Sequence, residues 1–87
     1  MSKSLSAFLV VVSCSYSMDS HKLLHEANDL FINKKYEKSV ELYEKIIEGG
    51  QENSTVFYNL GNAYYRLGNI GHAIWAYKHA NKFSPRD

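Results

Sequence analysis

Four histidines and one cysteine are the first residues of this 87-residue chain to consider for metal binding or nucleophilic chemistry. His21 and His25 stand four residues apart, one helical turn, which is the spacing of a two-histidine metal pair. Only Glu26 and Asp29 are close enough in sequence to complete a set of three or four ligands. Such a sparse set does not favour metal binding. The sequence therefore predicts no metal site and no cofactor.

Catalysis would require a nucleophile beside a base, a glycine loop for phosphate or a buried pair of carboxylates. The sequence offers none of these sets, and its one cysteine, Cys14, lies in an apolar N-terminal segment. A formal net charge of +1 leaves no broad positive excess for nucleic acid or an anionic membrane. We therefore expect a protein that is not an enzyme and does not bind nucleic acid.

The N-terminal segment has the three regions of an export signal. Lys3 is followed by the apolar run 5–12 and then by small residues up to Ser17. The apolar run is much shorter than the ~20 residues that cross a bilayer as a helix. Residues 1–17 are therefore expected to be a signal peptide or a lipoprotein leader.

Two processing routes fit this leader. Ser15-Tyr16-Ser17 has the small-x-small pattern that precedes signal-peptidase cleavage, which would release a chain starting at Met18. Val11-Val12-Ser13-Cys14 resembles a bacterial lipobox, which makes Cys14 a candidate for lipidation. Either route predicts an exported protein, periplasmic or membrane-associated, with membrane contact only through the leader or a lipid anchor. The alternative is a cytoplasmic protein with a frayed N-terminus or a true start at Met18.

From Ser20 onward the sequence matches itself at an offset of 34 residues, so that Ala27-Asn28 corresponds to Gly61-Asn62 and Tyr43 to Tyr77. Within each unit, apolar residues recur at three- and four-residue spacing in two segments separated by a turn, which indicates two amphipathic helices. Small residues where the helices approach, with tyrosines filling the gaps, predict close antiparallel pairs. The expected fold is all-α, with two stacked antiparallel helix-turn-helix units after the leader.

Polar residues and glycines mark the expected ends of these helices. Asp19 or Ser20 and Asn53 or Ser54 can cap the first helix of each unit, and the expected stops are Asn33-Lys34-Lys35, Gly49-Gly50, Gly68-Asn69 and Pro85.

The second unit resembles the tetratricopeptide repeat (TPR): Phe57-x2-Leu60-Gly61-x2-Tyr64 is followed by Ala73-x3-Tyr77-x2-Ala80-x4-Pro85. On this resemblance, residues 54–87 are TPR unit 2 and residues 20–53 are a degenerate TPR unit 1. The family implies a short right-handed α-solenoid. The run from Phe57 to Gly71 is also similar to the envelope-associated repeat proteins of bacterial aerotolerance (Bat) operons.

In the tetratricopeptide family, the first helix of each unit lines a concave groove that holds partner peptides. The resemblance implies that the partner-binding residues here are Leu24, Asn28, Phe31, Tyr58, Asn59, Asn62, Tyr65 and Arg66. The asparagines can pair with peptide amides, and the tyrosines add rigid contact area. The alternative is that Asn62 and Tyr65 belong to a frequent repeat sequence and face solvent. Leu24 stands where the chaperone-tail clamp of some relatives has a lysine, which argues against that variant.

The expected function is a non-enzymatic protein–protein interaction scaffold of the bacterial cell envelope, whose partner is a protein or peptide such as an envelope complex component. The alternatives are a cytosolic co-chaperone or assembly adaptor, or a fragment of a larger TPR protein. Residues 20–53 carry five Lys and seven Asp or Glu (−2), whereas residues 54–87 carry four Lys or Arg and one Asp (+3). Complementary ends of this kind suggest head-to-tail self-association, but such small counts more often belong to a solvated surface.

Overall fold

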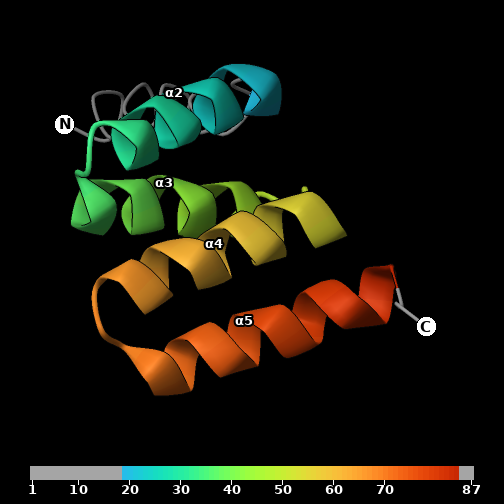
Figure 1. Cartoon of the computed structure of the whole chain (residues 1–87). Coiled ribbons are helices and arrows are strands. Elements are labelled where there is room, and N and C mark those ends of the chain that lie inside the picture. Colours follow the sequence, from blue (N-terminus) through green and yellow to red (C-terminus); the bar gives the residue numbers. More distant parts are fainter. Residues whose placement is uncertain (1–18, 85–87) are drawn as a thin grey trace, which may run out of the picture.

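The structure is a computed structural model that describes residues 19–84. Those residues form four α-helices and no strand: α2 (Ser20–Ile32), α3 (Tyr36–Glu48), α4 (Ser54–Arg66) and α5 (Ile70–Phe83). The helices lie side by side in chain order, each antiparallel to the one before it (Figure 1). The expected all-α fold is confirmed for this part of the chain. The expected leader, including Cys14, and the expected stop at Pro85 lie outside the described residues.

Side-chain caps and left-handed turns set the helix boundaries. Asp19 Oδ1 accepts a hydrogen bond from the backbone N–H of His21, and Asn53 Oδ1 accepts one from Val56 N–H, at 3.0 and 2.9 Å. The turn inside each unit contains one residue with positive φ, Lys34 at 64° and Gly68 at 82°. These two positions are related by the 34-residue offset, so the first unit places a lysine where the second uses the residue best suited to that backbone.

A close helix approach holds the second unit together. Gly61 of α4 is buried against the ring of Tyr77 on α5, and a Cβ built on Gly61 would lie 2.6 Å from Tyr77 Cε1. In the first unit, the corresponding Ala27 accepts a hydrogen bond at its carbonyl from the buried Ser39 hydroxyl, at 3.0 Å. Small residues therefore permit the close packing that the sequence predicts, and in unit 2 the facing group is the Tyr77 ring.

An aromatic cluster further ties α4 to α5. The buried ring of Phe57 stacks on Phe83 at 5.8 Å and meets Trp75 edge-on at 5.9 Å. Trp75 remains 48% exposed. The cluster covers Phe57 but leaves Trp75 partly open to solvent. Its ring contacts add apolar packing between α4 and α5.

A polar contact between α3 and α4 helps to join the two units. The hydroxyl of the buried Tyr64 on α4 donates a hydrogen bond to the Glu44 carboxylate on α3. Burial of the hydroxyl, reinforced by this bond and by the negative charge of Glu44, raises the pKa of Tyr64 from 10.0 to about 12. The neutral phenol is therefore the form that the folded state favours.

We expect Gly61→Ala to destabilise the fold by about 1–3 kcal/mol, because the new methyl group must displace the Tyr77 ring. Chemical denaturation followed by circular dichroism measures this change. Gly71→Ala is the matched control, since a Cβ there meets nothing within 4 Å, and it should stabilise α5 by up to about 1 kcal/mol. Equal effects of the two substitutions would contradict the proposed close approach.

The Tyr64 hydroxyl should make stability fall at alkaline pH. The unfolded chain ionises first, so the contribution of Tyr64 is complete below pH 10.0 and is lost as the pH rises through about 12. We expect Tyr64→Phe to reduce the loss of unfolding free energy over that interval, measured by denaturation at stepped pH. Tyr65→Phe, which removes a hydroxyl from an exposed ring, is the control. An unchanged pH profile in Tyr64→Phe would refute the assignment.

Candidate partner-binding groove

A concavity of about 290 Å³ opens between α2 and α4, the first helices of the two units. Its lining residues are Asn28, Phe31, Ile32, Tyr43, Asn59 and Asn62. We call this concavity the amide groove, because three of its side chains are amides. Four of these residues, Asn28, Phe31, Asn59 and Asn62, belong to the set that the sequence pointed to.

A tyrosine from the second helix of each unit holds an asparagine on the first helix. The Tyr43 hydroxyl donates to Asn28 Oδ1 at 2.5 Å, and the Tyr77 hydroxyl donates to Asn62 Oδ1 at 2.6 Å. Both pairs are separated by 15 residues, and they are related by the 34-residue offset. Because each bond engages the amide oxygen, it directs the donating NH₂ group of the asparagine away from the tyrosine.

The third amide connects the two units across the groove. Asn59 Nδ2 on α4 donates to Asn28 Oδ1 on α2 at 3.2 Å. Asn28 Oδ1 therefore accepts from two donors, one in each unit, which fixes its rotamer. An incoming ligand would meet Asn28 through its NH₂ group, a donor suited to a peptide carbonyl.

The tyrosines of these pairs have altered acidity. Burial raises the pKa of the Tyr43 hydroxyl, and hydrogen bonding from Ser39 and Asn59 opposes the shift in part. Burial also raises the pKa of Tyr77, with the nearby Tyr58 adding to it. Both phenols therefore remain hydrogen-bond donors to their asparagines at neutral pH.

Apolar side chains form the other part of the amide groove. Phe31 is half-buried and packs edge-on against Tyr36 with ring centroids 5.3 Å apart, which holds its ring in place. Ile32 is 72% exposed, which leaves its side chain open to contact. The groove thus combines oriented amide donors with an apolar edge, the pairing that suits a peptide backbone flanked by an apolar side chain.

The structure places the other expected partner-binding residues outside the amide groove. Leu24 packs partly buried against the core, and Tyr58 lines a second concavity beside α5. Tyr65 is 59% exposed, and the Arg66 guanidinium lies 5.8 Å from the centroid of the Tyr36 ring, in a cation–π contact.

Of the two remaining groove residues, Ile32 and Tyr43, Tyr43 is the one that the sequence pattern places in the core. Its ring is almost fully buried, at 1% exposed, which agrees with its expected role as a core residue. Its hydroxyl nevertheless reaches Asn28 in the groove. The repeated asparagine–tyrosine pair, at the same separation in both units, is the signal that could have identified it.

Residues 19–84 contain no group of three or more His, Asp or Glu side chains that could hold a metal ion. His25 Nε2 lies 3.4 Å from an Asp29 carboxylate oxygen, and both side chains are exposed. Among the helices described, none combines the length and the apolar character that crossing a membrane requires.

Two helix pairs that stack in register, with the first helix of each lining a concavity, define a helical-repeat protein. A family model described as TPR repeat matches residues 27–68, and one described as tetratricopeptide repeat matches residues 54–87. Residues 27–87 are therefore similar to tetratricopeptide repeats, a family whose repeats commonly act as protein–protein interaction modules and are typically non-catalytic. No curated protein matches the chain.

Proposed function

We propose that this protein is a non-enzymatic scaffold that holds an extended segment of a partner protein in the amide groove. The observation that carries this proposal is the linked set of asparagines, oriented by Tyr43 and Tyr77 from the second helix of each unit. Preoriented donors lower the cost of ordering side chains on binding. If the asparagine–tyrosine pairs only stabilised the fold, the asparagines of both units would not need to line the same concavity.

The chemistry of the amide groove indicates the kind of segment it accepts. The residues that line it include no charged side chain, so recognition depends on amides and apolar surface. Peptide carbonyls would accept from the asparagine NH₂ groups, while one apolar side chain would rest beside Phe31 and Ile32. The partner segment is therefore extended and largely uncharged where it enters the groove.

We further propose that the scaffold works in the bacterial cell envelope, with a partner among envelope complex components. The support is the sequence of residues 1–17, with its apolar run and the lipobox-like motif ending at Cys14. The similarity of the run from Phe57 to Gly71 to Bat-operon repeat proteins points in the same direction. A cytosolic adaptor, or part of a larger repeat protein, is the alternative for the same groove.

Site-specific photocrosslinking in cells tests the amide groove. A photoreactive phenylalanine analogue at Phe31 should crosslink to a partner polypeptide, because this position combines groove contact with partial exposure. The same analogue at Glu41, an exposed position on α3, is the matched control. We expect Asn59→Ala to reduce the Phe31 crosslink several-fold, since it removes the amide that spans the units.

Crosslinks of equal yield from positions 31 and 41, or a yield that Asn59→Ala leaves unchanged, would contradict the groove. Circular dichroism of Asn59→Ala confirms that the variant folds. Identification of the crosslinked protein by mass spectrometry then defines the partner.

The mature N-terminus tests the proposed location. Mass spectrometry of the protein purified from its native cells should show either a diacylated Cys14 or a chain beginning at Met18. Cys14→Ser should abolish acylation in the first case and change nothing in the second. An intact N-terminus at Met1 or Ser2 would instead support the cytosolic alternative.

A further inference from the structure

The two units differ in how completely their second helices are covered. On α3, Val40 and Tyr43 are 8% and 1% exposed, because α4 lies against them. Their counterparts on α5 at the 34-residue offset are Ile74, which is 50% exposed, and Tyr77, which is half-buried. The described chain thus leaves open on α5 the surface that it covers on α3.

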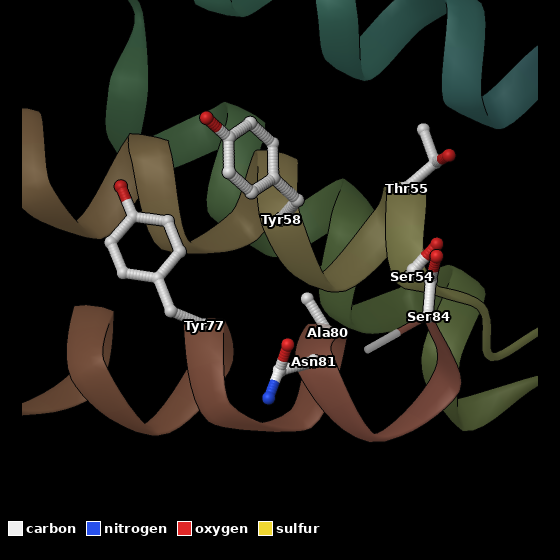
Figure 2. Close-up of a pocket in the computed structure, with 7 residues that line it drawn as sticks. All are labelled: Ser54, Thr55, Tyr58, Tyr77, Ala80, Asn81 and Ser84. Atoms are coloured by element: carbon white, nitrogen blue, oxygen red, sulfur yellow. The ribbon is translucent and has the colours of Figure 1, made fainter. Parts of the chain in front are cut away.

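This surface borders a concavity of about 600 Å³ between α4 and α5 (Figure 2). Thr55 and Tyr58 line it from α4, and Tyr77, Ala80 and Asn81 line it from α5. We call the uncovered surface the α5 seat and define it by Ile74, Tyr77, Lys78 and Asn81. The seat is the counterpart on α5, at the 34-residue offset, of the surface of α3 against which α4 packs.

The interface between α3 and α4 shows which kind of element fits the α5 seat, because α3 corresponds to α5 at the 34-residue offset. On α4, the helix that packs against α3, Val56 and Ala63 are 1% and 0% exposed and stand seven residues apart on one helix face. The next residue, Tyr64, donates a hydrogen bond to Glu44 of α3. The element that fits is therefore an amphipathic helix with an apolar residue, a small residue seven positions later and a polar contact immediately after it.

Charge distinguishes the α5 seat from its counterpart on α3. Glu44 and Glu48 of α3 are replaced at the 34-residue offset by Lys78 and Lys82 of α5. Residues 54–84 carry Arg66 in addition to these lysines and include no Asp or Glu. A helix that approaches α5 meets positive charge where α4 meets carboxylates, so complementarity requires an acidic helix.

A second copy of this chain does not fit the seat. In a head-to-tail stack, α2 would approach with Lys22 and Asp29 at the positions of Val56 and Ala63. Both charged residues are exposed in the structure, and burying them would be costly. Two copies meeting through α5 would bring the lysines of both seats together. The expected head-to-tail association is therefore disfavoured by the residues of α2.

We propose that the α5 seat docks an acidic amphipathic helix of a partner protein. That helix carries a branched apolar residue, a small residue seven positions later and a carboxylate at the following position, which pairs with Lys78. Its apolar face covers Ile74 and Tyr77. This docking site differs from the amide groove in both its elements and its chemistry, because it selects a charged helix instead of an extended neutral segment.

Two synthetic peptides test the α5 seat on the full chain. Both are stapled helices of about 20 residues, long enough to keep a helix when crosslinked. They carry Val and Ala at the positions of Val56 and Ala63, and at the position of Tyr64 one carries Glu and the other Lys. Fluorescence anisotropy should show that the Glu peptide binds the full chain about five- to tenfold more tightly than the Lys peptide.

Charge reversal on the protein provides the decisive comparison. Lys78→Glu should invert the preference between the two peptides, while Lys45→Glu, at an exposed position of α3, should leave it unchanged. Ile74→Asp should weaken both peptides at least tenfold by placing a charge in the apolar part of the seat. Asn59→Ala should leave both affinities unchanged, which separates this site from the amide groove.

The proposal is overturned if the Glu peptide does not bind, or if Lys78→Glu leaves the preference as it was. Sedimentation velocity over a range of concentrations tests whether a second copy of the chain occupies the seat instead. Self-association of the full chain that Ile74→Asp abolishes would assign the seat to a second copy and overturn the partner helix.

Discussion

A helix in this stack exposes apolar surface to water unless another helix lies on each side of it. α3 and α4 meet that condition, since each packs against its own unit and against the other. The consequences appear in the burial of individual residues, since Val40 of α3 and Val56 of α4 are 8% and 1% exposed. Among residues 19–84, α5 contacts α4 alone, whereas α2 contacts α3 and, to a smaller extent, α4. Their outer faces have diverged in different ways, because α2 presents Lys22 and Asp29 to solvent whereas α5 presents Ile74. The exposed flank of α2 is therefore polar, whereas that of α5 has the character of an interface.

The packing inside each unit also determines the chemistry of the concave side. The space beside Gly61 admits the Tyr77 ring, and the same ring places its hydroxyl on Asn62. A core residue and a groove residue are thereby joined by one side chain. Unit 1 repeats the arrangement with Ala27 in place of Gly61 and with the Tyr43–Asn28 bond. This dual use of tyrosine, with a buried ring and a hydroxyl at the surface, is possible because the phenol is amphipathic. It also explains why a change deep in the helix pair would alter the orientation of amide donors in the groove.

Much of the fold could be predicted from sequence because periodicity, capping residues and the 34-residue offset all indicate the same helices. Asn53 and Gly50 mark boundaries through local backbone chemistry, which depends on few neighbours. The site was less accessible to such reasoning. Asn28 and Phe31 line one concavity, but Tyr43 was expected only in the core, since the reach of its hydroxyl depends on the distance between α2 and α3. The positions of Tyr65 and Arg66 depend on rotamers and on the Tyr36 ring, which no pattern along the chain specifies.

One side chain, Tyr77, links the α5 seat to the amide groove, and this has a physical consequence. Tyr77 belongs to the seat, where a docked helix would cover it, and its hydroxyl orients Asn62 in the groove. Tyr58 lines the same concavity as Tyr77, with ring centroids 5.6 Å apart, and it lies on α4, the helix that carries Asn59. A helix bound at the seat would therefore restrict the tyrosine that holds one of the groove amides. The ring of Tyr77 and its hydroxyl thus serve two surfaces, so a substitution at this residue would affect both the α5 seat and the amide groove.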